Sequence, residues 1–228
     1  MTSGTEKEIR SGEIWFIRHG ESTTNAGEVS KDKFSTQLTA LGREQAKAVS
    51  LAVPRAPELI VVTPYIRTQQ TALPLEERFP ASPREIWDLH EFSALGDANY
   101  INRTWTERIP VMQDFWERCD PDFVDGDGAE SFSAMARRVR AGLEKLQRRE
   151  ESFTVVFSHG YIIQTIRLML SHPGLPEKEL MQRLAVSTRT SHIENCTITR
   201  VLKTAQGLSL HAETLESMDK GLISEHVD

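Results

Sequence analysis

Short apolar runs alternate along the chain with longer segments whose apolar residues recur every three or four positions. The runs predict four buried strands, at about residues 13–18, 58–62, 85–89 and 153–157. The most regular helical pattern lies in one long segment, where apolar residues step along a face opposite charged ones: Phe132, Met135, Val139, Leu143 and Leu146. Strands that alternate with helices are typical of an α/β fold with a mostly parallel sheet.

Capping residues and prolines set the limits of the first helices. Thr39 is a suitable N-cap for a helix that runs to about Ala52. Thr63 and Pro64 open the next helix, since proline is accepted at an early helical position. Pro74 should kink or interrupt this second helix, because proline lacks the N–H that the interior of a helix uses.

The later part of the chain repeats these signals. Asp127 to Glu130 has the outline of a capping box, with Asp127 as the cap of the long helix. Late strands at 196–202 and 208–213, joined by a turn at Gly207, predict a hairpin at or near the sheet edge. Further helices are expected over residues 104–119, 161–170 and 176–184.

The chain length suits one large domain. With 228 residues we expect a single domain over 12–215, between flexible polar tails at 1–11 and 216–228. The hydrophobic and charged fractions, 39% and 26%, are ordinary for a globular protein. The first eleven residues lack a signal-peptide core, and no apolar run is long enough to span a membrane, so we expect a cytoplasmic protein.

Charge and cysteine content exclude several classes of protein. The net charge of −6 argues against broad binding of nucleic acid or of an anionic membrane, because both need a basic face. The two cysteines, Cys119 and Cys196, are too few for a disulfide scaffold. The acidic stretch 120–127 does not follow the order of ligands in an EF-hand loop, so we interpret it as a solvated loop.

Four chemically active groups follow the four predicted strands. Arg18 and His19 follow the first, Arg67 lies shortly after the second, Glu91 follows the third and His159 the fourth. Ligands of parallel sheets bind beyond the carboxyl ends of the strands, so these residues should meet on one rim. Each residue alone could be an ordinary surface or core residue, but one anion site would explain all of them together.

These residue types suit a phosphate ester. Two arginines and two histidines form a cationic pocket for a tetrahedral dianion. One histidine can attack phosphorus and form a covalent intermediate, while the remaining cations stabilise the equatorial oxygens. Glu91 can protonate the leaving oxygen and later deprotonate water. The cationic side chains do the neutralising, so we expect neither a metal nor a cofactor.

The order of these motifs resembles the histidine phosphatase superfamily, which also contains the cofactor-dependent phosphoglycerate mutases. The stretch Arg18-His19-Gly20-Glu21-Ser22 matches the family signature, and four motifs follow one another in the family's order. The resemblance spans about residues 13–202 and includes these segments: Leu38 to Ala46, Thr63 to Ala72, Leu89 to Glu91, Gly128 to Ser131, and Val155 to Gly160.

The resemblance implies a role for each matching residue. His19 would be the phosphorylated nucleophile and Glu91 the proton donor. Asn25 would contact the phosphoryl group or the substrate. The rest of the phosphate pocket would come from Arg18, Arg67 and His159. The implied fold has three layers, α/β/α, with one antiparallel strand in a mainly parallel sheet.

The sequence departs from the family after Glu91. Residues 92–96 read Phe-Ser-Ala-Leu-Gly, unlike the segment found there in the mutases, which counts against mutase activity. We expect the segment 92–127 to face the substrate. Trp105 and Trp116 should pack inside the protein. Arg103 and Arg108 are candidates for binding a second anionic group, but we expect them to face solvent. No role is predicted for His90 or His192.

The sequence therefore predicts a metal-independent phosphomonoester hydrolase of the histidine acid type, with a phosphohistidine intermediate on His19. Its substrate would be a small phosphorylated compound that the residues do not identify. One alternative is a phosphoglycerate-type phosphomutase, and the other is a non-catalytic phospho-ligand binding or adaptor domain. The second is disfavoured, because a binder needs arginines but has no need of Glu91 or a reactive histidine. The oligomeric state stays open.

Overall fold

A six-stranded sheet forms the centre of the protein. In this computed structural model, which describes residues 11–212 and 214, the strands lie in the order β3-β2-β4-β1-β5-β6. Their bounds are β1 Gly12–Arg18, β2 Leu59–Val62, β3 Arg84–Ile86, β4 Phe153–Ser158, β5 Ile198–Thr204 and β6 Gly207–Leu210.

The sheet is mostly parallel. β1 pairs with β4 in parallel, and β4 and β3 each pair with β2 in parallel. β5 runs antiparallel to β1, and β6 turns back along β5 at the edge of the sheet. The predicted α/β fold, its single reversed strand and its edge hairpin are confirmed.

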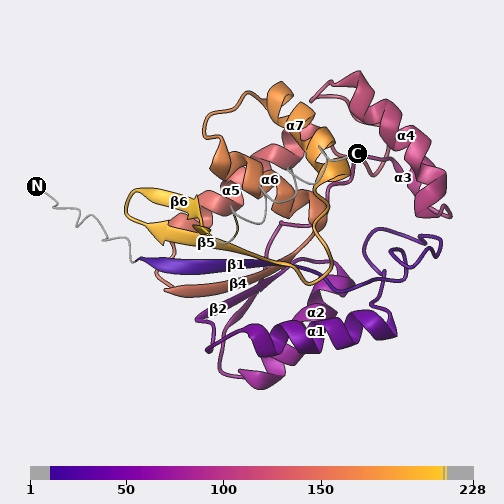
Figure 1. Ribbon diagram of the computed structural model, residues 1–228. Helices are drawn as coiled ribbons and strands as arrows, with labels where there is room; N and C mark the ends of the chain where they lie inside the picture. The colour runs from indigo at the N-terminus through magenta and orange to yellow at the C-terminus, as the bar shows by residue number, and fades with distance from the viewer. Residues whose placement is uncertain (1–10, 213, 215–228) are drawn as a thin grey trace, which may run out of the picture.

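Helices cover both faces of the sheet. Figure 1 shows α1 and α2 below the strands and α5, α6 and α7 above them, while α3 and α4 lie beyond the strand ends. The helix bounds are α1 Ala40–Ala52, α2 Ile66–Arg78, α3 Asp97–Tyr100, α4 Trp105–Arg118, α5 Phe132–Arg148, α6 Gly160–Ser171 and α7 Glu177–Thr190.

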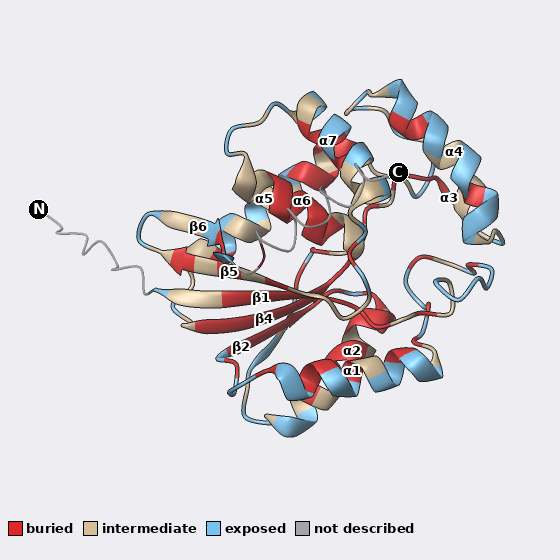
Figure 2. Cartoon of the chain, in the orientation of Figure 1, coloured by how far each residue is buried: buried red, intermediate tan, exposed pale blue. Residues whose placement is uncertain are grey.

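The sheet separates two apolar cores, and β1 contributes to both. Ile14 and Phe16 point into the core beneath α5, α6 and α7, whereas Trp15 and Ile17 point into the core beneath α1 and α2. Successive side chains of a strand point to opposite faces, so an unbroken apolar run is what a sheet covered on both sides requires. Figure 2 shows the central strands β1, β2 and β4 buried along most of their length.

The start of α2 differs from the prediction, and Pro74 does not interrupt the helix. α2 begins at Ile66, two residues after Pro64, and it continues through Pro74 to Arg78 without interruption. Ala72 and Leu75, on either side of the proline, are fully buried in the smaller core. Tertiary packing of this turn offsets the donor that proline lacks.

The start of α5 and the length of two other elements also differ from expectation. The N-cap of α5 is Ser131, whose side chain accepts from the N–H of Ala134, so Asp127 is not the cap. The carbonyl of Asp127 instead accepts from the N–H of Asp97 at the start of α3. β3 is shorter than expected, ending at Ile86, and α7 is longer.

Several terminal expectations lie outside the described residues. These are most of the 1–11 tail, all of the 216–228 tail, and the end of the strand expected at 208–213. Within the described part of the chain, no helix is both long and apolar enough to cross a membrane.

Candidate active site

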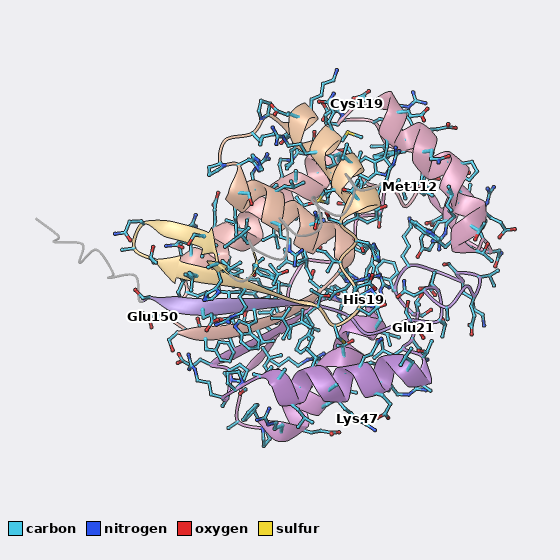
Figure 3. All side chains as sticks on the ribbon, viewed as in Figure 1. His19, Glu21, Lys47, Met112, Cys119 and Glu150 are labelled. Carbon is cyan, nitrogen blue, oxygen red and sulfur yellow. The ribbon has the colours of Figure 1, made fainter. Side chains whose placement is uncertain are left out.

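The two central parallel strands bring two histidines together. β1 and β4 pair with Arg18 opposite Ser158, so His19 and His159 leave the sheet side by side. Their ring centroids lie 5.2 Å apart. Figure 3 shows His19 at the end of β1, between the sheet and α4.

Arg67 reaches the same point from the first turn of α2. Its Nε donates to Nε2 of His19 at 3.1 Å, and its Nη1 donates to the carbonyl of Lys33 at 3.1 Å. The guanidinium lies 4.6 Å from the centre of the Tyr65 ring. A buried cation is thus fixed against one nitrogen of His19.

These contacts define the tautomer of His19. Arg67 can only donate, so Nε2 of His19 carries the lone pair, and Nδ1 carries the proton that it donates to the carbonyl of Gly20 at 2.7 Å. Burial lowers the pKa of His19 well below its ordinary value, and the charges of Arg67 and Arg18 lower it further. The ring is therefore neutral at pH 7, with its lone pair directed at Arg67.

Arg18 is held from the opposite side. Its Nη1 contacts Nε2 of His192 at 2.8 Å and also donates to the carbonyl of Ile193. Burial and the charge of Arg18 lower the pKa of His192, which keeps that ring a neutral acceptor. The side-chain amide of Asn195 donates to the carbonyl of His19 at 2.8 Å, so the segment before β5 anchors the end of β1.

Glu91 lies at the edge of this cationic group. Its carboxyl accepts from the N–H of Phe92 at 3.0 Å and faces the N–H of Tyr161 in the first turn of α6. Burial raises the pKa of Glu91 above its ordinary value, although Arg67 and Arg18 oppose this shift. The net shift makes Glu91 hold its proton to a higher pH than an exposed glutamic acid would, and the protonated form is the one that can donate a proton.

His159 occupies a deeper position than expected. The side chain is fully buried, and Nε2 contacts Oγ1 of Thr63 at 2.9 Å. Nδ1 has no hydrogen-bond partner among the described residues. Burial lowers the pKa of His159 well below the ordinary value. His159 thus packs against His19 without lining the cavity described next.

A cavity of about 720 Å³ opens over these groups. Arg18, His19, Arg67 and Glu91 line its floor. Asn25 lines it too, and its Oδ1 accepts from Oγ of Ser22 at 2.9 Å. The wall is apolar in large part and comes from the loop after β3 and from α4: Phe92, Ala94, Leu95, Trp105, Ile109, Met112 and Trp116.

The titratable side chains of the described residues form no metal site. Among residues 11–212 and 214, no group of three or more His, Cys, Asp or Glu side chains is arranged to hold a metal ion.

A family comparison identifies the family of the chain. The model of the histidine phosphatase superfamily (branch 1) matches residues 14–214. The chain belongs to the histidine phosphatase superfamily. The match includes every residue of the rim, from Arg18 to His159.

Relatives of this chain carry both phosphatase and mutase names. A metal-independent phosphoserine phosphatase of Arabidopsis thaliana is 26% identical over 172 residues, covering 74% of this chain and 72% of the relative. A "Probable phosphoglycerate mutase GpmB" of Serratia proteamaculans (strain 568) is 27% identical over 193 residues, covering 79% and 85%.

Solved structures share the fold. The α-ribazole phosphatase of Shigella flexneri superposes with a TM-score of 0.67 at 19% identity, over 87% of this chain and 94% of that one. A mycobacterial glucosyl-3-phosphoglycerate phosphatase gives 0.64 at 22% identity, over 89% and 97%. At such identities the likeness concerns the fold alone.

Some residues of the candidate site are not predictable from the sequence. His192 touches Arg18, yet its surroundings in the sequence carry no periodic pattern or motif that would place it there. Lys33 donates to the carboxylate of Asp97 at 3.0 Å, but Asp97 lies 64 positions later in the chain, so no local pattern links the two residues. His90 stacks on Tyr65 with ring centroids 5.5 Å apart, outside the group around His19.

Two expectations about the wall are wrong. Arg108, expected in solvent, is buried at 3% exposure and lines the cavity. Trp105, expected in the interior, is 46% exposed at the cavity mouth, because it is the first residue of α4. Trp116 does pack inside, stacked 5.8 Å from the Tyr161 ring. Arg103 is half-buried and does not line the cavity.

Proposed function

We propose that this protein is a metal-independent phosphomonoester hydrolase that forms a phosphohistidine on Nε2 of His19. One observation carries the proposal: the lone pair of a neutral, buried His19 lies 3.1 Å from the Nε of Arg67. A nucleophile and a phosphate-binding cation thus meet at one point. The phosphatase names among the relatives support the same reaction class.

The arginines hold the phosphoryl group for attack. Arg67 and Arg18 bind its equatorial oxygens and stabilise the charge that spreads over them in the transition state. Gly160 begins α6 directly after His159, so free N–H groups at the helix start add to this positive field. The hydrogen bond from Nδ1 to Gly20 keeps the lone pair on the attacking nitrogen.

The reaction proceeds in two displacements. Nε2 of His19 forms a bond to phosphorus while the bond from phosphorus to the ester oxygen breaks, and Glu91 gives its proton to the departing alcohol. Glu91, now a carboxylate, takes a proton from water as that water attacks phosphorus. The N–P bond breaks, inorganic phosphate leaves, and Glu91 and His19 return to their starting states.

The test is hydrolysis of an aryl phosphate in the presence of EDTA. Wild-type protein should release phosphate, and His19→Ala should lose activity by roughly 10⁴-fold or more, as expected for removal of a nucleophile. His172→Ala is the matched control, since this ring lies on the far end of α6 beside Arg183 and should leave the rate unchanged. A rapidly quenched reaction should also contain a phosphoenzyme that is stable in base and labile in acid.

Four results would contradict the proposal. Full activity in His19→Ala would exclude the nucleophile, and loss of wild-type activity in EDTA would show a metal requirement. Transfer of the phosphoryl group to a second substrate molecule in preference to water would identify a mutase. Binding of phosphate esters without turnover would instead support an adaptor domain.

A further inference from the structure

A buried arginine lies in the cavity wall, on α4 and not at the strand ends that form the rim. Arg108, on the first turn of α4, is only 3% exposed and lines the cavity. Its guanidinium carbon lies 4.3 Å from the centre of the Tyr100 ring and 5.6 Å from that of Trp105. Its Nε donates to the carbonyl of Thr104 at 3.2 Å. The side chain is therefore held in place by two rings and a backbone contact.

No carboxylate neutralises Arg108 within the part of the chain that the structure describes. Lys33, the other buried cation of the wall, differs in this respect, because it donates to Asp97 at 3.0 Å. Removing a charge from water without a partner is costly. A fixed and unpaired cation facing a cavity is therefore a site for an anion supplied by a ligand.

The cavity that the rim and Arg108 both line is large, and much of its wall is apolar. About 720 Å³ is within the range of pockets that enclose drug-sized molecules, and far exceeds what a phosphoryl group needs. Ile109, Met112 and Trp116 of α4 line the cavity. The Oε1 of Gln164, on the opposite side in α6, is buried without a hydrogen-bond partner in the described structure, so it offers one acceptor to a bound molecule.

We propose that the alcohol released from the substrate is a bulky, largely apolar body that carries a second anionic group, a carboxylate or a phosphate, bound by Arg108. This inference rests on the proposed hydrolase function, since it concerns the part of the substrate beyond the transferred phosphoryl group. The two rings beside Arg108 favour a flat body, which can stack on the exposed Trp105.

A matched series of aryl phosphates tests the second anion. Phenyl phosphate has the aromatic body but no second anion. Aryl phosphates with a carboxylate on linkers of increasing length place a second anion at several distances from the phosphoryl group. The bisphosphate of hydroquinone carries a phosphate as the second anion. Wild-type kcat/KM should be highest for one of the two anionic sets, which also tells whether a carboxylate or a phosphate is preferred.

Substitution of Arg108 should remove this preference selectively. Arg108→Gln should lower kcat/KM for the favoured anionic substrate by about 10- to 100-fold, as for loss of a charged hydrogen bond, and change phenyl phosphate by less than about threefold. Arg103→Gln is the matched control, because it removes the same charge from a neighbouring residue that does not line the cavity. It should leave the preference intact.

The outcomes separate this inference from the proposed function. Suppose that phenyl phosphate is hydrolysed through His19. If the substrates with a second anion then show no higher kcat/KM, or if Arg108→Gln retains their higher kcat/KM, the second-anion inference is overturned and the proposed hydrolase function stands. If nothing is hydrolysed, calorimetric titration of the same compounds into wild type and Arg108→Gln decides. Tighter binding of the anionic compounds that Arg108→Gln abolishes supports the site, and equal binding rejects it.

Discussion

The rim of the sheet and the wall formed by α3 and α4 line one cavity but are built differently. On the rim, His19 and Arg67 are bonded to each other and to backbone carbonyls, so these side chains are fixed by the ends of strands and the start of a helix. On the wall, Trp105 and Ile109 are 46% and 36% exposed and project from one helix face. The rim holds its side chains in fixed positions, which suits a chemical step. The wall is more exposed, which suits recognition of different substrates.

Glu91→Gln gives the largest expected effect among tests of this contrast. The carboxyl lies where rim and wall meet, and as an acid it contributes to the rate in proportion to how poor the leaving group is. We expect a loss of about 10²- to 10⁴-fold for alkyl phosphates and a much smaller loss for nitrophenyl phosphate. Steady-state kinetics on both esters checks this, and equal losses would remove Glu91 from the acid role.

The pH dependence sharpens the same test. Burial raises the pKa of Glu91, so the wild-type rate on alkyl phosphates should fall only as pH rises through that raised value. Burial lowers the pKa of His19, so the nucleophile stays neutral and active below pH ~6.5, where a free histidine would already be protonated. Glu91→Gln should lack the alkaline limb and keep the acid one.

His192→Phe should have a moderate effect, because His192 positions Arg18 and touches no reacting atom in the proposed mechanism. Loss of the acceptor should raise KM for all phosphate esters by about tenfold, since Arg18 keeps its contact with Ile193. His192→Gln keeps an acceptor and should restore most of the binding. A fall in kcat with unchanged KM would contradict a positioning role.

Ile109→Ala should have the smallest effect, and only on large substrates. Truncation of this exposed wall residue should leave phenyl phosphate within about twofold and raise KM for bulky aryl phosphates by no more than about fivefold. Leu51→Ala, at an exposed position of α1 away from the cavity, is the control. A uniform loss on every substrate would mean that the wall and the rim are not separable.

The contrast between the rim and the wall also determines which site residues can be predicted from the sequence. Apolar runs identify buried strands, and in a parallel sheet the residues that follow them share one edge, so Arg18, His19 and Arg67 can be brought together by the order of strands and motifs alone. Arg108 and His192 cannot. Their placement depends on how α4 and the segment before β5 fold over the cavity. No local sequence pattern encodes this tertiary arrangement.

Helix limits show a related distinction. Thr39 is predictable as a cap, because its side chain bonds the N–H of Gly42 three residues on, which is a local interaction. The continuity of α2 through Pro74 depends instead on burial of its flanking residues in the core. Local chemistry follows from neighbouring residues in the chain, whereas the tertiary packing that overrides it does not.

Lys33 has a consequence for how such an enzyme can diversify. Its carbonyl accepts from Arg67, while its ammonium group donates to Asp97 at the start of α3 and to the carbonyl of Gly128. One residue thus connects Arg67, the arginine bonded to His19, to the segment that shapes the cavity. If that segment were replaced by one that fits differently, the displacement would reach Arg67 through Lys33. Selection for a new substrate in this protein must therefore proceed in steps small enough to keep position 33 in place.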